Sequence, residues 1–419
     1  MKNIGIVGAG IAGLHLGLYL RLHGVPTTVY TDKTPQQMEA SRLLNAVARF
    51  DHTRQREREM GVDHWNYPDF DTCCAHLNIL GDPPLRFCGR LVRPASFVDM
   101  RIYLATLLRD FQERGGWVVI GSMQAGDVAD LAEEHDLVVV SSGQGHLADM
   151  FPLIPERSPY THPQRLLCAG LYRGIDYPDP LGVSFNIAPG NGEVFQAPFH
   201  SFEGRVSSIL FEAIPGGALE GITRMRYEDD PAGFEATVLD LLRDYAPDIY
   251  GRIDRDCFGL TRPLDLLQGA ITPYVRRGYT RLSNGRHAVA IGDVHILNDP
   301  IVGQGANLAS HSAWVLGEAI VHSRDFDESF CRKVEERIWE YAGPVTQWSN
   351  AFLQPPSPHA LDLMTAAAQD QAVADAFVEG FNRPRRMWQA LSTPDGTARF
   401  LRRYGHIRQD VMVPLATSY

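Results

Sequence analysis

Short apolar runs, bounded by glycine or polar positions, mark the first part of the chain as alternating strands and helices. Residues 3–7 form an apolar run of strand length, and residues 26–30 form a second one. Between them, residues 11–22 carry apolar side chains at helical spacing. This order predicts a β-α-β unit at the start of the chain, with both strands buried.

The same two patterns return further along the chain. Residues 101–114 place apolar side chains on one helical face, and a Gly-Gly pair follows as a stop signal. Residues 137–140 are wholly apolar and predict another buried strand. Residues 288–291 form a further strand that returns the chain to the first sheet, and residues 306–322 form a long helix.

From about residue 165 the pattern changes to short β-rich runs separated by turn sequences such as Pro-Gly-Asn-Gly. Their length and spacing predict an antiparallel sheet, which forms a layer separate from the parallel one. A helix is expected after this sheet, and the chain beyond residue 330 is expected to be mostly helical. The β-rich runs cover residues 165–173, 182–187, 193–199 and 206–214, and the helix covers residues 231–245.

These elements predict an α/β protein with a Rossmann-type domain built on a parallel sheet, an inserted antiparallel β-sheet domain and a helical C-terminal region. A chain of 419 residues is long enough for such a division. The Rossmann-type domain is expected to be discontinuous, and the insertion to have two parts. The Rossmann-type domain is expected at residues 1–75, 96–160 and 260–330. The inserted antiparallel domain is expected at residues 76–95 and 161–259, and the helical C-terminal region at residues 331–419.

Charge and composition change this picture mainly by what they exclude. The formal net charge is −11, and Lys and Arg are scattered along the chain, which argues against nucleic acid or an anionic membrane as a partner. No apolar run is long enough to cross a bilayer, and the N-terminus enters a strand without a signal-peptide pattern. We therefore expect a cytoplasmic protein.

The polar residues do not form a metal-binding or hydrolytic pattern. Six cysteines are irregularly spaced, which favours reduced thiols over a disulfide framework. No His-Glu-x-x-His or other ligand cluster occurs in the sequence, so no metal site is expected. Neither a Ser-His-Asp set nor a convincing pair of carboxylates is evident, so no residue is expected to act as an acid or base catalyst.

The strongest local signal is a glycine motif between the first strand and the first helix. Gly8, Gly10 and Gly13 have the spacing of the dinucleotide fingerprint, with Ile11 and Ala12 inside it. The first glycine permits a tight turn, the second lets a pyrophosphate approach the backbone, and the third lets helix and strand pack closely. The helix N-terminus then offers N–H groups to the phosphates.

The acid that usually binds the ribose is displaced at the end of the second strand. The usual position falls on Thr31, and the carboxylate comes one residue later at Asp32. Thr31 can make a hydrogen bond to a ribose hydroxyl, although it lacks the charge-assisted pair that a carboxylate makes. This departure favours a cofactor that exchanges.

A second group of motifs lies almost three hundred residues further on, where a strand ends and the long helix begins. It resembles the ribityl-binding motif of flavoprotein monooxygenases, in which the aspartate holds a ribityl hydroxyl. The helix N-terminus then directs its dipole at the pyrimidine end of the flavin. The residues are Gly292 and Asp293, then Asp299 and Pro300, then Gly303, Gln304, Gly305, Ala306 and Asn307.

Two further segments narrow the resemblance to one family. Residues 42–45 read Arg-Leu-Leu-Asn, and residues 264–269 read Leu-Asp-Leu-Leu-Gln-Gly. With the glycine motifs they make the chain similar to the epoxidase component of the two-component styrene and indole monooxygenase family. The similarity extends from Ile4 to the end of the long helix, and continues more loosely through Phe381 and Trp388.

The resemblance implies an FAD-dependent enzyme that receives reduced FAD from a separate NADH-dependent flavin reductase. Reduced FAD and O2 would give a C4a-hydroperoxide, which epoxidises a small aromatic alkene of the styrene type to styrene oxide. The chemistry belongs to the cofactor, and the protein supplies position, dryness and hydrogen bonds. The family also makes a homodimer an expectation.

The resemblance also assigns residues to the site. Arg42 and Arg101 are expected to bring guanidinium groups to the flavin. Asn45 and His76 are the polar candidates nearest the substrate. The rest of the expected substrate pocket is Leu44, Ala46, Val47, Phe185, Phe211 and Pro300, and Pro300 also contacts the cofactor.

Three alternatives stay open. Indole monooxygenase shares the flavin motifs, and the Asn45–Val47 segment favours styrene over indole. A single-component NAD(P)H-dependent aromatic hydroxylase would carry an Asp-Gly motif where this chain has Ser141, Ser142 and Gly143. A non-catalytic Rossmann protein would be expected to have lost the Gly292-Asp293 region, which is complete here.

Overall fold

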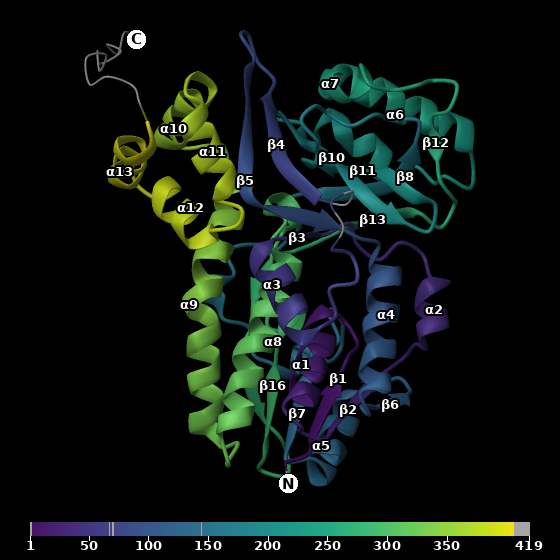
Figure 1. The fold of residues 1–419 in the computed structure, drawn as a ribbon, viewed down its shortest axis with the longest axis vertical. Coiled ribbons are helices and arrows are strands. Elements are labelled where there is room, and N and C mark those ends of the chain that lie inside the picture. The colour runs from purple at the N-terminus through teal and green to yellow at the C-terminus, as the bar shows by residue number, and fades with distance from the viewer. Residues whose placement is uncertain (1, 67, 69–70, 144, 406–419) are drawn as a thin grey trace.

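The structure is a computed structural model that describes residues 2–66, 68, 71–143 and 145–405. Two sheets lie at opposite ends of the molecule, with helices packed against them (Figure 1). The parallel sheet lies at the end that holds the N-terminus, and a group of C-terminal helices lies beside the other sheet. Among the described helices, none has the length and hydropathy needed to cross a membrane.

The parallel sheet has six strands in the order β15-β16-β7-β1-β2-β6. β15 runs antiparallel to β16, and the other four pairings are parallel. The predicted β-α-β unit is present, because α1 connects β1 to its parallel neighbour β2. The strands are β1 (Ile4–Val7), β2 (Thr27–Thr31), β6 (Trp117–Ile120), β7 (Leu137–Val140), β15 (Tyr279–Arg281) and β16 (His287–Ala290).

Helices cover both faces of this sheet, which explains why its central strands are apolar without alternation. On β7, Leu137 and Val139 pack into the core beneath α1, α4 and α8, whereas Val138 and Val140 pack against α5 on the other face. All four side chains are therefore buried. The helices are α1 (Ile11–Leu22), α4 (Met100–Glu113), α5 (Ala125–Glu134) and α8 (Gly305–His322).

The second sheet is largely antiparallel and follows the order β12-β8-β11-β10-β9-β4-β5-β3, with β13 also paired to β8. Helix α6 covers one of its faces with a buried apolar core. The strands are β3 (Ala48–Arg49), β4 (Asp71–Ile79), β5 (Leu85–Phe97), β8 (Leu166–Arg173), β9 (Gly182–Ala188), β10 (Gly192–Ser201), β11 (Gly204–Ala213), β12 (Gly259–Leu260) and β13 (Leu266–Ala270).

The C-terminal helices form a third group, and α11 packs against the long strand β5 (Figure 1). Short elements complete the fold. The remaining α-helices are α2 (Pro35–Glu39), α3 (Asp51–Met60), α6 (Pro231–Tyr245), α7 (Pro247–Tyr250), α9 (Glu328–Phe352), α10 (Pro358–Gln369), α11 (Gln371–Glu379), α12 (Pro384–Leu391) and α13 (Pro394–Tyr404). The 3-10 helices are η2 (Ala148–Met150), η3 (Pro155–Arg157), η4 (Ala218–Thr223), η5 (Gly292–Val294) and η6 (Pro300–Val302), and β14 (Tyr274–Val275) pairs with β17 (Ile296–Leu297).

The predicted fold class is confirmed, and the differences lie at the joins between the sheets. The expected boundary after residue 75 falls inside β4, which forms a long hairpin with β5. β13 joins the antiparallel sheet by pairing with β8, although residues 260–330 were assigned to the other domain. Both differences arise from strand pairing between distant segments, which no local pattern reveals. The part of the expected C-terminal region beyond residue 405 lies outside the described residues.

The third glycine of the fingerprint yields a prediction about folding. A Cβ at Gly13 would collide with the carbonyl oxygen of Gly8 and lie 2.5 Å from the Ser141 hydroxyl. Gly13→Ala is therefore expected to lower the free energy of unfolding by about 1–3 kcal/mol. Gly10→Ala is the control, since its Cβ would meet only the Ser141 carbonyl oxygen at 3.9 Å. Urea unfolding of the FAD-free proteins compares them, and equal losses would contradict the packing role of Gly13.

Candidate active site

A cleft of about 470 Å³ lies between the two sheets, at the carboxyl ends of the parallel strands. This is where open α/β sheets bind their ligands. Its lining brings together segments that lie far apart in the sequence. They are Val7–Ala12 after β1, residues 30–33 at β2, residues 44–47, residues 121–123 after β6, residues 141–143 after β7, Gly292 and Asp293, Leu297 and Asn298, and Pro300, Gly303, Gly305, Ala306 and Ala309.

The glycine loop in the cleft wall has the geometry that a pyrophosphate requires. Gly8 has φ of +115°, and a Cβ there would lie 2.6 Å from the backbone of Ser141, so only glycine fits. Gly10 is the N-cap residue of α1, and no side chain caps this helix. The first-turn N–H groups of α1 therefore remain available to phosphate oxygens, together with the positive end of the helix dipole.

Polar groups at the end of β2 lie beside this loop. Thr31, Asp32 and Lys33 all line the cleft. The Thr31 side chain is buried, and its Oγ1 accepts a hydrogen bond from the Lys33 N–H at 3.4 Å. Asp32 is exposed, so its carboxylate is free to meet a ribose hydroxyl. The carboxylate thus stands one residue later than in the usual fingerprint, while remaining in the cleft wall.

The cleft wall also holds polar groups that have no partner among the described residues. Burial raises the pKa of Asp293 to about 6, and no described residue forms a hydrogen bond or ion pair with its side chain. Both amide atoms of Asn298 are buried without a hydrogen-bond partner in the described chain. Buried polar groups of this kind are costly unless a ligand satisfies them. A ribityl chain, which carries several hydroxyls, would do so.

A second, apolar cavity of about 110 Å³ adjoins the cleft. Ala46, Leu210, Pro300 and Gly303 line both spaces and so form the boundary between them. Aromatic side chains make up much of the cavity wall, with two hydroxyl-bearing residues among the rest. The aromatic residues are Phe50, Phe97, Phe185, Phe195 and Phe381, and the hydroxyl-bearing ones are Thr72 and Ser208.

Two curated proteins match this chain over nearly their whole length. "Styrene monooxygenase StyA" of Pseudomonas fluorescens is 39% identical over 407 residues, covering 96% of this chain and 98% of the relative. A second StyA, from Pseudomonas sp, is 38% identical over 398 residues, covering 94% of this chain and 96% of the relative. The chain belongs to the styrene monooxygenase family.

Further comparisons agree with this placement. Residues 143–252 match the family described as "Styrene monooxygenase A putative substrate binding domain". A mutant of the flavin-dependent brominase Bmp2 has the same fold, with a TM-score of 0.66 at 13% identity over 96% of this chain and 99% of the other. The myxobacterial halogenase CndH has a TM-score of 0.62 at 16% identity over 96% of both chains. As a member of its family, the chain is a flavin-dependent monooxygenase.

The structure brings most of the expected cofactor residues of this monooxygenase into the cleft wall, but some lie behind it. Gly13 packs against Gly8 and Ser141 and does not line the cleft. The amide of Gln304 donates to the Phe381 carbonyl oxygen at 2.9 Å. The Asn307 amide donates to the carbonyl oxygen of Ala48 at 2.9 Å. Gln304 and Asn307 therefore hold the start of α8 in place through hydrogen bonds on the side away from the cleft.

The two arginines expected at the flavin are bound elsewhere. Arg101 is buried between two carboxylates, 2.5 Å from Asp99 Oδ2 and 2.6 Å from Asp265 Oδ1. Arg42 pairs with Glu228 at 2.7 Å. Neither arginine lines the cleft. Because a buried guanidinium must be paired, the carboxylates of Asp99 and Asp265 hold Arg101 in the protein interior, which corrects the expected flavin contact.

The expected substrate residues divide in the same way. Leu44, Asn45, Ala46 and Val47 line the cleft, and Phe185 and Pro300 line the cavity. Phe211 points to the opposite face of β11, into the core beneath α6, so its neighbour Leu210 takes the place at the cavity. The His76 ring is bonded to the Pro180 carbonyl oxygen at 2.8 Å, and Ala75 lines the cavity instead. Side-chain alternation along a strand explains both corrections.

Several lining residues were missed. Ser141, Ser142 and Gly143 line the cleft, although the sequence singled them out only for lacking an aspartate. Thr72 and Ser208 line the cavity without any motif around them. The one available signal was the alternation along β11, which separates its two faces but does not say which face meets the flavin cleft.

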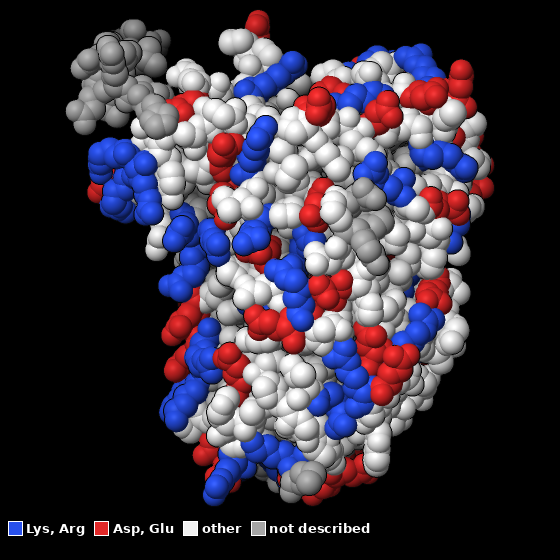
Figure 2. Space-filling view, in the orientation of Figure 1, with Lys and Arg blue, Asp and Glu red and all other residues white. Residues whose placement is uncertain are grey.

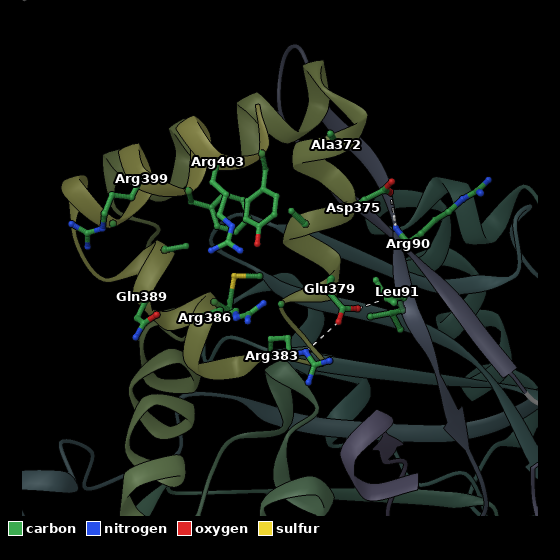
Figure 3. Close-up of a pocket in the computed structure, with 18 residues that line it drawn as sticks. Arg90, Leu91, Ala372, Asp375, Glu379, Arg383, Arg386, Gln389, Arg399 and Arg403 are labelled. Atoms are coloured by element: carbon green, nitrogen blue, oxygen red, sulfur yellow. Dashed lines mark hydrogen bonds and ion pairs between the residues drawn. The ribbon is translucent and has the colours of Figure 1, made fainter. Parts of the chain in front are cut away.

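Another hollow, a groove of about 1040 Å³, lies between β5 and helices α11, α12 and α13 (Figure 3). Arg386 and Arg403 point into it, and Arg399 points away (Figure 3). The structure thus gathers arginines that are scattered in the sequence, and a blue cluster lies over α13 on a face where the two charges otherwise mix (Figure 2). No fingerprint glycine lines this groove, although its volume exceeds that of the cleft. The volume of a hollow alone therefore does not locate the cofactor site.

Two of the thiols are close neighbours, with the Cys73 and Cys74 Sγ atoms 3.8 Å apart. All six cysteines are free, at positions 73, 74, 88, 168, 257 and 331. Across the residues that the structure describes, no three His, Cys, Asp or Glu side chains are grouped so that they could hold a metal ion.

Asp293 yields a prediction about the cofactor. Asp293→Ala is expected to raise the Kd for FAD roughly 10- to 100-fold, because a hydrogen bond to an ionised group contributes about 1.5–3 kcal/mol. Asp130→Ala, an exposed aspartate on α5, is the control. Fluorescence titration of FAD into the three proteins measures the effect, with circular dichroism to confirm folding. Equal affinities would remove Asp293 from the site.

Proposed function

We propose that this monooxygenase epoxidises styrene-type vinyl arenes, with FAD held in the cleft and the arene held in the adjoining cavity. The observation that carries the proposal is the position of the apolar cavity. The cavity shares Pro300 and Gly303 with the cleft. The glycine loop lines the cleft, and the phenylalanine cluster lines the cavity. The relatives at 39% and 38% identity are named styrene monooxygenases, which agrees with this substrate class.

The residues of the cleft fit FAD along its length. The loop from Gly8 to Gly10 would hold the pyrophosphate, and Asp32 with Thr31 the ribose. Asp293 and Asn298, which lack partners within the described chain, would bind the ribityl hydroxyls. When bound in its reduced form, FAD supplies the activation of O2.

The cavity would position the arene and keep water out. An apolar cavity of roughly 150 Å³ stays dry and binds benzene in a well-studied case, and this cavity of about 110 Å³ is of the same order of size. The phenylalanine side chains would hold the ring, and Pro300 would keep the vinyl arm at the boundary with the cleft. Exclusion of water favours oxygen transfer over loss of the activated oxygen as peroxide.

We also propose that reduced FAD comes from a separate NADH-dependent flavin reductase. The sequence carries one dinucleotide fingerprint, and the exposed Asp32 beside Thr31 would make an exposed ribose contact. An exposed contact contributes little to affinity because water competes for it, so FAD would enter and leave between turnovers. A flavin that exchanges can be reduced on another protein.

This proposal predicts that the chain alone does not use NADH. Stopped-flow mixing of the FAD-loaded protein with NADH in the absence of O2 is expected to leave the flavin absorbance unchanged. The chain is also expected to bind reduced FAD more tightly than oxidised FAD. Addition of a flavin reductase is the positive control. Rapid bleaching without the reductase would favour a single-component NAD(P)H-dependent hydroxylase.

Indole is the second candidate substrate, and two hydroxyls in the cavity favour it. The Thr72 Oγ1 is buried with no hydrogen-bond partner among the described residues. Ser208 also makes no side-chain hydrogen bond within the part of the chain described. An indole N–H left without an acceptor would cost about 1–3 kcal/mol, and either hydroxyl would remove that cost. Asn45, in the cleft wall, is a third acceptor.

These hydroxyls give a prediction about preference. The unmodified enzyme is expected to act faster on styrene than on indole when both are supplied with the same reductase and FAD. Thr72→Val and Ser208→Ala together are expected to lower the kcat/KM for indole roughly tenfold, since about 1.4 kcal/mol corresponds to a factor of ten. The kcat/KM for styrene should change little. A large preference of the unmodified enzyme for indole would overturn styrene as substrate, and an equal loss on both substrates would remove the hydroxyls from recognition.

A further inference from the structure

The sheet face that lines the apolar cavity ends in two glutamates. On β11, Ser208 and Leu210 line the cavity, and Glu212 follows on the same face because side chains alternate along a strand. On β10, Glu193 lies directly opposite Glu212 in the strand register. Both glutamates are buried, and Glu212 has no exposed surface. Two carboxylates side by side in the interior repel each other unless something neutralises them.

A third buried carboxylate comes from the turn that separates the cleft from the cavity. Asp299 is 1% exposed, and its Oδ1 accepts a hydrogen bond from the Ile301 N–H at 3.1 Å. Its carboxyl group meets that of Glu212. No N–H or O–H of any described residue donates to Asp299 Oδ2 or to either oxygen of Glu212. A proton shared between the two carboxyl groups would satisfy Asp299 Oδ2 and one oxygen of Glu212.

Among the described residues, Arg165 is the cation that faces this group, and it is already bound. The Arg165 guanidinium donates to Glu193 through two bonds, Nε to Oε2 at 2.7 Å and a terminal nitrogen to Oε1 at 3.0 Å. If every group were ionised, one positive charge would face three negative ones. Unpaired charges in the interior cost several kcal/mol, so such a group keeps a proton instead.

We propose that Glu212 is a positioning residue that remains protonated and donates its O–H to Asp299, which holds the wall between the flavin cleft and the substrate cavity in place. That wall consists of Pro300, Ile301, Val302 and Gly303, all of which line the cavity. Asp299 shapes it as the N-cap of η6, and the Ser349 hydroxyl donates to the Asp299 carbonyl oxygen at 3.1 Å. The inference rests on the proposed function only in one respect, the assignment of FAD to the cleft and of the arene to the cavity.

The electrostatics support this arrangement. Burial is the main cause that raises the pKa of Glu212 well above its ordinary value, with the Asp299 and Glu193 carboxylates as further causes. Burial also raises the pKa of Asp299 to about 6. Burial raises the pKa of Glu193 as well, although the Arg165 guanidinium acts to lower both values. Because these folded-state values are raised, their contribution to stability is full below about pH 4. It is lost as the pH rises through about 6 and beyond.

The test uses Glu212→Gln, which keeps a donor for Asp299 but cannot ionise. The unfolding midpoint of the variant is expected to match that of the unmodified protein near pH 5 and to exceed it at pH 8 and above. The Kd for FAD is expected to rise less with pH in the variant than in the unmodified protein. Glu193→Gln is the matched control, since it removes the carboxylate of Arg165 and should lower the midpoint at every pH. A Glu212→Gln midpoint at or below the unmodified one at pH 8 would overturn the proposal.

Infrared spectroscopy gives a readout that needs no variant. The unmodified chain with ¹³C-labelled glutamate side-chain carboxyls is expected to show a shifted carbonyl band of a protonated carboxylic acid at pH 7. Labelling of aspartate in place of glutamate should leave that band unshifted. A spectrum in which every glutamate is ionised at pH 7 would overturn the proposal. Because the measurement involves neither flavin nor substrate, its failure would leave the proposed epoxidation standing.

Discussion

The amide of Asn307 connects the two halves of the site. Its Oδ1 accepts from the Phe50 N–H at 2.9 Å and from the Thr53 hydroxyl at 2.8 Å. Its Nδ2 donates to the carbonyl oxygens of Ala48 at 2.9 Å and Gly303 at 3.1 Å. Every hydrogen-bonding position of the amide is therefore used. The bonds join the start of α8 to strand β3 of the antiparallel sheet and to the start of α3. The cleft and the cavity both border this contact between the two halves.

Two environments of opposite character meet there. The cleft presents backbone N–H groups and unpartnered polar side chains, which suit a charged, hydroxyl-rich dinucleotide. The cavity presents phenylalanine rings, which suit an aromatic hydrocarbon. Only a thin wall around Pro300 separates them. Under the proposed function, that geometry would let one protein hold a water-soluble cofactor and a water-insoluble arene with their reacting ends adjacent.

The wall is held by interactions that carry a cost of their own. Glu193, Glu212 and Asp299 place three carboxyl groups in the interior near one guanidinium. Hydrophobic side chains of similar size would avoid the desolvation penalty of these groups. Their position behind the wall gives a physical reason for their presence, because a hydrogen-bonded carboxyl pair fixes the direction of a turn more closely than apolar packing does.

The sequence by itself determined the parts of this protein that depend on local backbone geometry. The β-α-β unit, the glycine loop and the start of α8 follow from apolar periodicity and from turns that need glycine, and the structure has them within one residue of the predicted bounds. Only the tertiary structure decided which side chains reach the site. Arg101 is held by Asp265, far away in sequence, and Leu210 rather than Phe211 meets the cavity. Pairing partners and the inward face of a strand are set by distant segments, and a one-residue change of register reverses them.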